Sequence, residues 1–255
     1  MIAHRFLGGE GQLPCVILHG LLGSSRNWLT VGKSLAEHYS VYALDARNHG
    51  ESPHSNQMDY SVMAADIDEW RASVLGDQPF RLLGHSMGGK TAMRYACEHP
   101  DRVEGLVVVD IGVRAYQPRW EKEFDAMRRM PLQDLKSRSA AEDWLEAEGV
   151  SDWAFRKFLV TNIDRDADGA FCWAINLEVL QASLPQLFAQ PIDEGARYEG
   201  PVLWLRGERS NFVEESDHEQ ILRHFPQTRF KTIKGAGHNV HFDQMQAFVD
   251  AVKSL

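Results

Sequence analysis

The stretch Phe80-Arg81-Leu82-Leu83-Gly84-His85-Ser86-Met87-Gly88-Gly89 decides the fold. Its first apolar residues favour a strand, and residues 86–98, which end before Pro100, have helical periodicity. The pattern Gly-x-Ser-x-Gly lies between them and is typical of a sharp strand–helix turn that holds its serine in a strained conformation. Such a turn presents the Ser86 hydroxyl at a helix N-terminus, where the Met87 backbone N–H and the helix dipole stabilise negative charge.

Similar apolar runs occur on both sides of this turn, and most of them are continuous rather than alternating. Continuous runs suit strands that are buried on both faces, as in a parallel sheet covered by helices. The runs are residues 15–19, 41–45, 80–84, 106–110 and 202–206, with a weaker one at 229–233. Residues 60–75 and 240–252 have helical periodicity. The alternation of strands and helices predicts an open α/β fold with a mostly parallel sheet.

Residues 112–200 interrupt this alternation. The segment contains no clear strand, holds four of the seven tryptophans and is divided by prolines, so it predicts several helices. It is too long for a structureless loop. We therefore expect a core domain of residues 1–111 and 201–255, with a helical cap of residues 112–200 inserted after the strand that ends at Asp110. Ligands of α/β sheets bind at this edge of the sheet.

The composition excludes several classes of protein. The chain has 255 residues and a net charge of −9, from 27 basic and 36 acidic side chains. This balance argues against nucleic-acid binding and gives no reason to expect binding to an anionic membrane. No apolar run approaches the roughly 18 residues of a membrane span, and the first residues lack a signal-peptide pattern. The three scattered cysteines predict no disulfide framework and a reducing, cytoplasmic location, and the histidine spacing predicts no metal site. We also expect no cofactor, and either a monomer or a homodimer.

A serine hydroxyl needs a base to become a nucleophile at neutral pH. The best candidate is His238, which lies in a loop of small residues between the last strand and the last helix, with His241 as the alternative. A His-Gly turn follows the first parallel strand, and it offers the Leu21 N–H as a second oxyanion donor beside Met87. Leu22 is the alternative donor if the turn is shifted by one residue.

Four motifs together resemble the α/β-hydrolase fold superfamily, and specifically its small bacterial esterases and thioesterases with mitochondrial relatives. The motifs are His19-Gly20, Asp45-Ala46-Arg47-Asn48-His49-Gly50-Glu51-Ser52-Pro53, Gly84-His85-Ser86-Met87-Gly88-Gly89 and Gly237-His238. The resemblance implies a serine hydrolase that cleaves carboxylic esters, with acyl thioesters as a further class, through an acyl-enzyme. Its partners would be small-molecule substrates, and it would need no cofactor.

The acid of the triad is where the sequence departs from the common pattern of this superfamily. Many relatives place an aspartate in the loop after the strand at 202–206, where this chain has Ser210. Asp110 ends the preceding strand, and the resemblance to the esterase group favours it, with Ser210 supporting the same network. Glu208, Glu214 and Asp217 remain alternatives. Asp45 is interpreted as a structural anchor for the loop at 47–53.

Two other functions are compatible with the fold. One is hydrolysis of carbon–carbon bonds in vinylogous diketones of the meta-cleavage type, although His85 and Asn239 replace residues common in those relatives. The other is a non-catalytic ligand-binding protein. The predicted cap offers apolar surface and cations that could attract an anionic acyl group or a coenzyme A phosphate, but core packing and a solvated helix face explain them better. These side chains are Trp120, Trp144, Trp153, Trp173 and Phe124, and Arg114, Arg119, Arg128 and Arg129.

Overall fold

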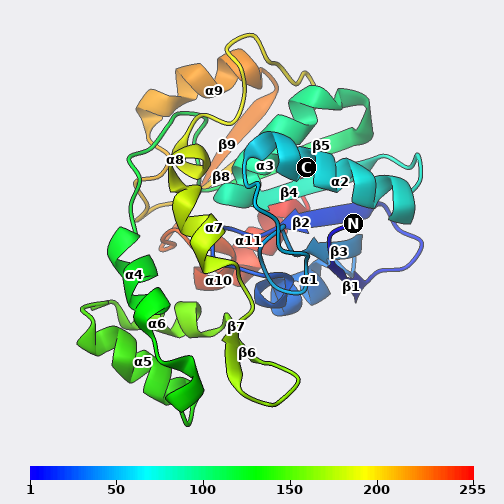
Figure 1. The fold of residues 1–255 in the computed structure, drawn as a ribbon. Coiled ribbons are helices and arrows are strands. Elements are labelled where there is room, and N and C mark those ends of the chain that lie inside the picture. The colour runs from blue at the N-terminus through cyan, green and yellow to red at the C-terminus, as the bar shows by residue number, and fades with distance from the viewer.

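The computed structural model describes residues 1–255 and contains a sheet of seven strands (Figure 1). The strands are β1 (His4–Gly8), β2 (Pro14–Leu18), β3 (Ser40–Leu44), β4 (Phe80–His85), β5 (Val103–Val109), β8 (Val202–Gly207) and β9 (Thr228–Ile233). They lie in the order β1-β3-β2-β4-β5-β8-β9. Only β1 runs antiparallel to its neighbour, and every other pair is parallel. The predicted fold class is confirmed.

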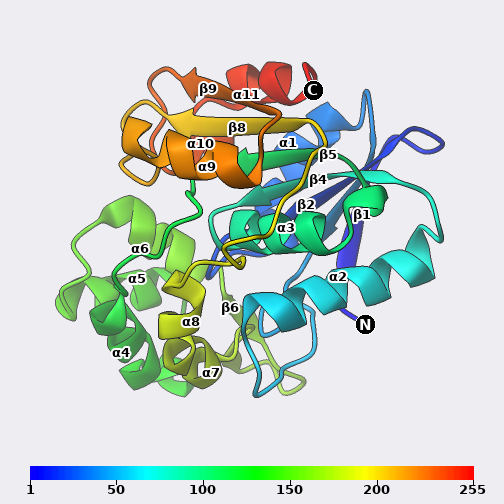
Figure 2. The same ribbon diagram turned by 90° about the horizontal axis from the view of Figure 1, so that it is seen from above.

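Helices cover both faces of the sheet, which explains the continuous apolar runs of its central strands. Figure 2 shows the sheet between two helical layers. The helices α1 (Leu29–Leu35), α10 (Val240–Asp243) and α11 (Met245–Val252) pack with the smaller apolar cluster. The helices α2 (Tyr60–Val74), α3 (Met87–Glu98) and α9 (His218–His224) pack with the larger one. All five residues of β2 are buried, as a strand between two covered faces requires.

Two elements of the core differ from the expectation. The edge strand β1 was not predicted, because none of its five residues is fully buried and its sequence contains no apolar run. The expected final helix is divided into α10 and α11 at Gln244, whose backbone (φ −140°, ψ 60°) is not helical. The Asp243 carboxylate at this break accepts a hydrogen bond from the Gly237 N–H at 2.7 Å, so α10 is tied to the loop that carries His238.

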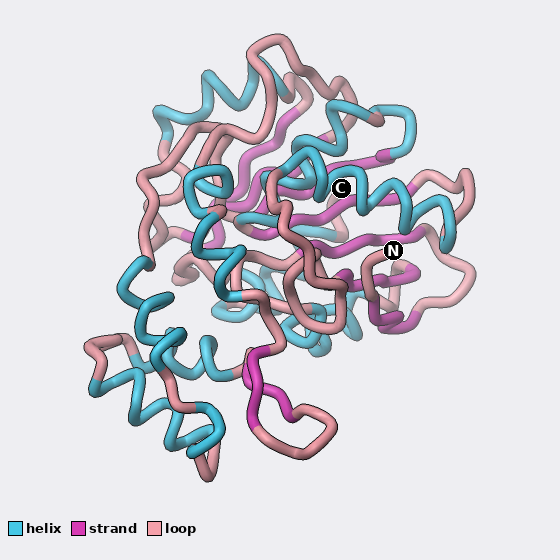
Figure 3. Tube along the Cα trace, in the orientation of Figure 1, coloured by secondary structure: helices cyan, strands magenta, loops and turns pink.

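The segment between β5 and β8 forms helices and one hairpin, and its helices α4, α5 and α6 lie in a separate lobe in Figure 1. Its helices are α4 (Glu121–Arg129), α5 (Arg138–Ala147), α6 (Trp153–Val160), α7 (Leu177–Ala182) and α8 (Leu184–Phe188). The segment also contains a short hairpin that was not predicted, in which β6 (Ile163–Arg165) pairs with β7 (Phe171–Trp173) (Figure 3). Each strand has only three residues, and β6 carries two charged side chains, so neither produces an apolar run.

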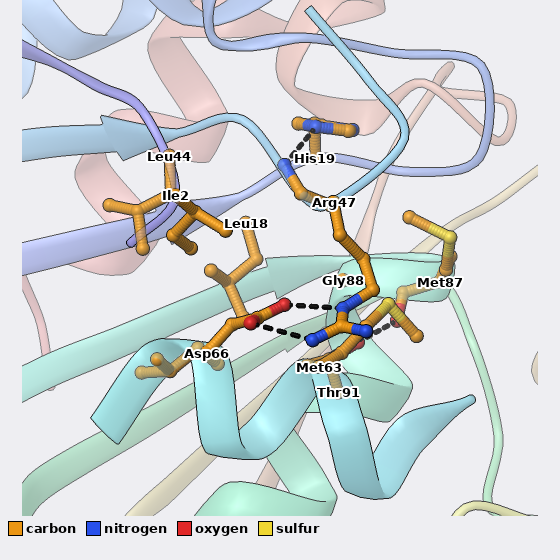
Figure 4. Close-up of a pocket in the computed structure, with 12 residues that line it drawn as sticks. Ile2, Leu18, His19, Leu44, Arg47, Met63, Asp66, Met87, Gly88 and Thr91 are labelled. Carbon is orange, nitrogen blue, oxygen red and sulfur yellow. Dashed lines mark hydrogen bonds and ion pairs between the residues drawn. The ribbon is translucent and has the colours of Figure 1, made fainter. Parts of the chain in front are cut away.

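The loop after β3 is fixed by two buried or half-buried charges. The Asp45 carboxylate accepts hydrogen bonds from the backbone N–H groups of Ser25, at 2.6 Å, and Glu51, at 3.0 Å. The Arg47 guanidinium forms two bonds to Asp66 on α2, at 2.6 and 2.7 Å, in the wall of a cavity of about 310 Å³ (Figure 4). This hydrogen bonding to Asp66 raises the pKa of Arg47. Neither Ser86 nor His238 lines this cavity, so it belongs to the scaffold behind the nucleophile turn.

None of the helices combines the length and the apolar character that crossing a membrane would require.

Candidate active site

Ser86 lies between the end of β4 and the start of α3, in a backbone conformation that a side chain rarely adopts (φ 53°, ψ −118°). Its N–H donates to the Val109 carbonyl at 3.0 Å, so the turn is tied to β5. The strand and helix cross so closely that a Cβ on Gly84 would lie 2.1 Å from the Gly88 carbonyl oxygen. The surrounding structure therefore enforces the strain, as is common for residues at functional sites.

Asp110 follows β5, is completely buried, and accepts three hydrogen bonds with its carboxylate. Its Oδ1 accepts from the Gly207 N–H at 2.9 Å, and its Oδ2 accepts from the Ser210 hydroxyl. The His238 Nδ1 lies 2.8 Å from the same Oδ2. A carboxylate that accepts the Nδ1–H fixes the imidazole tautomer with Nε2 free to accept a proton.

The alternative carboxylates are engaged elsewhere. Glu208 accepts from the Gly235 N–H at 2.8 Å, on the outside of the loop that carries His238. Asp217 pairs with the Arg114 guanidinium at 2.8 Å and accepts from the Glu214 N–H at 2.8 Å. The side chains of Glu208, Glu214 and Asp217 form no hydrogen bond to His238. Asp110 alone among the candidate acids therefore contacts the imidazole.

Two backbone amides beside Ser86 have no hydrogen-bond partner within the chain: those of Leu21 and Met87. Met87 is the first residue of α3, and such residues have no partner inside their helix. The Leu22 N–H, in contrast, donates to the His49 Nε2 at 3.2 Å. A Cβ on Gly20 would lie 3.3 Å from the Ser86 Cβ, so the turn with Leu21 packs directly against the serine. Of the two expected alternatives, Leu21 has the N–H that is free to donate.

Ser86 and His238 line one solvent-open cleft of about 1110 Å³. No hydrogen bond joins the Ser86 hydroxyl to the imidazole, and in unliganded sites such contacts are often long until substrate binds. Behind the serine, a narrower pocket is lined by apolar side chains, with Ser86 and Lys90 as the only other residues. His238 does not line this pocket. The serine thus stands between an apolar pocket and a wide cleft that contains the imidazole.

Three side chains surround His238, and of these Phe212 was not predicted to have a place in the site. The Phe212 ring stacks on the imidazole, with ring centres 4.0 Å apart. The His85 Nε2 donates to the His238 backbone carbonyl at 2.9 Å. His241 stacks on Trp28 at 4.0 Å, and burial lowers its pKa to about 3. Burial and the neighbouring imidazoles also lower the pKa of His85, so both flanking rings are neutral.

Lys90 was also missed, although a lysine four residues after Ser86, within a stretch of small or apolar residues (87–93), is a visible signal. Its side chain is buried, and its ammonium donates to the backbone carbonyls of Arg114, at 2.9 Å, and Ala189. Burial lowers the pKa of Lys90 to about 7. Arg114 and Ala189 lie near the two ends of the segment between β5 and β8, so Lys90 joins both ends to the nucleophile helix.

Of the four cap arginines considered as groups that could attract an anion, three have carboxylate partners. Arg114 pairs with Asp217, Arg128 with Asp125 at 3.6 Å, and Arg129 with Glu148 at 2.5 Å. Arg119 has no such partner and lines the wide cleft. The tryptophans differ as well, since Trp120 lines both cavities whereas 64% of Trp153 is exposed.

Comparison with known proteins places this chain in a family. A sequence model described as alpha/beta hydrolase fold matches residues 14–244. The chain is 38% identical to the mouse sn-1-specific diacylglycerol lipase ABHD11, over all of this chain and 84% of that protein. It is 32% identical to Esterase YbfF of Escherichia coli (strain K12), over 94% of this chain and 91% of that protein. A solved structure described as a marine microorganism esterase superposes with a TM-score of 0.94 and 33% identity, over 99% of this chain and 98% of that one.

Proposed function

This chain belongs to the α/β-hydrolase fold family, and from that premise we propose that Ser86, His238 and Asp110 form the catalytic triad of a serine esterase. The chain is an esterase/lipase-type hydrolase. One observation supports the assignment of residues above all others: a fully buried carboxylate, Asp110, bonds to the one imidazole that shares a cleft with the strained serine.

The reaction begins when the Ser86 Oγ attacks the carbonyl carbon of an ester. His238 Nε2 takes the hydroxyl proton, and the imidazolium that forms is stabilised by the Asp110 carboxylate. The carbonyl oxygen becomes an oxyanion, which accepts hydrogen bonds from the N–H groups of Leu21 and Met87. Each such donor contributes roughly 3–4 kcal/mol to the stability of the transition state.

The tetrahedral intermediate collapses when the bond to the leaving oxygen breaks and His238 returns its proton to that oxygen. The alcohol departs and Ser86 carries the acyl group. Water then attacks the acyl carbon with His238 again taking a proton, and the carboxylic acid is released as the Ser86 hydroxyl is restored. A thioester follows the same path with sulfur as the leaving atom, and we propose thioesters as a second substrate class.

The two cavities assign the two halves of the substrate. The acyl group occupies the narrow apolar pocket behind Ser86, and the leaving group extends into the wide cleft beside His238, which must protonate it. We further propose that residues 112–200 act as a cap over this cleft. A cytoplasmic location and a monomeric or dimeric state stay predictions.

The test is hydrolysis of para-nitrophenyl acetate by the Ser86→Ala variant. We expect a loss of at least about 10⁴-fold in kcat/KM with an unchanged melting temperature, because the variant lacks only the attacking oxygen. Labelling by a fluorophosphonate should disappear in the same variant. The matched control is Ser61→Ala on the outer face of α2, which should keep both signals. Turnover or labelling retained in Ser86→Ala would show that the nucleophile is a different residue.

A further inference from the structure

We propose that Arg119 is a specificity-determining residue that binds an anionic group, a carboxylate or a phosphate, on the leaving-group half of the substrate. This inference rests on the proposed function, because it uses the position of His238 to identify that half. The starting observation is that Arg119 forms neither an ion pair nor a side-chain hydrogen bond, although it lines the cleft that contains Ser86 and His238.

A stack of three groups holds the guanidinium near the imidazole. The Phe212 ring lies 4.0 Å from the centre of the His238 ring, and the Arg119 guanidinium carbon lies over the same phenyl ring at 4.7 Å from its centre. These two distances limit the separation between guanidinium and imidazole centre to less than ~9 Å. The cation is therefore close to the reacting bond without taking part in the catalytic hydrogen bonds.

The cavities show on which side of the reacting bond the cation lies. Arg119 and His238 both line the wide cleft, and neither lines the narrow pocket behind Ser86. The imidazole protonates the leaving group, so a group beside it faces the alcohol or thiol half of the substrate. An anion on that half would meet the guanidinium. An anion on the acyl half would enter a pocket whose one cation, Lys90, already donates to the backbone carbonyls of Arg114 and Ala189.

The charges around Arg119 leave it available for a ligand. The other charged side chain that lines the cleft, apart from histidines, is Asp152. Its carboxylate caps α6 by accepting from the Phe155 N–H at 2.9 Å, so it is engaged by its own helix. A planar guanidinium that keeps its hydrogen-bond donors free and rests on an aromatic face is a suitable group for binding carboxylate or phosphate in two-point geometry.

The experiment compares matched acetates that differ only in the charge of the leaving group. The substrates are para-acetoxybenzoate, para-acetoxyphenyl phosphate and the neutral para-acetoxybenzamide. A fourth substrate, the para-nitrophenyl hemiester of glutaric acid, has its carboxylate on the acyl half, with para-nitrophenyl butyrate as its neutral match. The variants are Arg119→Gln, Arg119→Lys and the control Arg128→Gln, whose arginine is also exposed but pairs with Asp125 on α4.

We expect Arg119→Gln to lower kcat/KM roughly tenfold for at least one of the two anionic phenyl acetates, and less than about twofold for the neutral amide. The carboxylate and phosphate arms show which anion is preferred. Arg119→Lys should retain part of the wild-type kcat/KM for the anionic acetates, and Arg128→Gln should retain all of it. Added salt should reduce the difference between the wild type and Arg119→Gln. For the hemiglutarate, Arg119→Gln should change kcat/KM no more than it does for para-nitrophenyl butyrate.

If Arg119→Gln lowered kcat/KM equally for the charged and the neutral acetates, or left it unchanged for both anions, the role of Arg119 would be overturned. A loss confined to the hemiglutarate would overturn its placement on the leaving-group half. Failure of the proposed function looks different, because the wild-type protein would then leave the neutral acetate intact or would hydrolyse it equally well after Ser86→Ala.

Discussion

Charged groups are held in opposite ways in the catalytic core and in the lobe between β5 and β8. Asp110 in the core has no exposed surface, and three donors satisfy its carboxylate. Asp125 in the lobe pairs with Arg128 at 3.6 Å, with about half of each side chain in solvent. A buried carboxylate that loses its partner pays the full cost of desolvation, whereas an exposed pair contributes about 0–1 kcal/mol. The core therefore fixes the chemistry, whereas an exposed pair on the outer surface of the lobe can change without affecting it.

The largest effect is expected where the buried carboxylate meets the imidazole. Asp110→Asn should lower kcat roughly 10³–10⁴-fold, because an amide cannot stabilise the imidazolium and can donate to Nδ1, which favours the wrong tautomer. Activity against para-nitrophenyl acetate measures this loss. Glu208→Gln is the matched control, since Glu208 accepts from the Gly235 N–H and does not contact His238. A larger loss in the control than in Asp110→Asn would move the acid to the loop after β8.

Lys90 lies where the core and the lobe meet, and it predicts a change of stability with pH. Its pKa is about 7 in the folded protein and about 10.4 in an unfolded chain. Between these values the unfolded chain binds one more proton, so the free energy of unfolding rises with pH across this window. Below pH 7 both states are protonated, and the cost of the buried ammonium is complete and constant.

Urea unfolding of the wild type and Lys90→Met at pH 6.5, 8 and 9.5 isolates this contribution. The free energy of unfolding of the wild type, relative to the variant, should rise by an amount on the order of a few kcal/mol over this range. Other titrating groups are common to both proteins and cancel in the difference. Parallel curves would mean that Lys90 keeps an ordinary pKa and that the junction is more hydrated than its burial indicates.

The same contrast explains which features could be predicted from the sequence. Strands covered on both faces appear as apolar runs, so six of the seven core strands were located, whereas the exposed edge strand β1 and the three-residue hairpin of β6 and β7 have no such signal. Ser86 was located by its motif, since the tight turn restricts the residues around it. The stacking of Phe212 on His238 joins the loop after β8 to the loop after β9. These two loops are separated in the sequence, so a local pattern does not encode the contact.

The smallest effect is expected on the outer surface of the lobe. Trp153, with 64% of its surface exposed, lies at the start of α6 and has the Lys157 ammonium over its ring at 5.6 Å. Trp153→Ala should therefore change the free energy of unfolding by no more than about 0.5 kcal/mol. Phe124→Ala, at a completely buried aromatic of α4, should cost about 3–5 kcal/mol. Chemical denaturation of both variants measures the difference. A large loss in Trp153→Ala would mean that this ring is covered in solution, by a second copy or by movement of the lobe, and the division between a fixed core and a tolerant surface would then fail at α6.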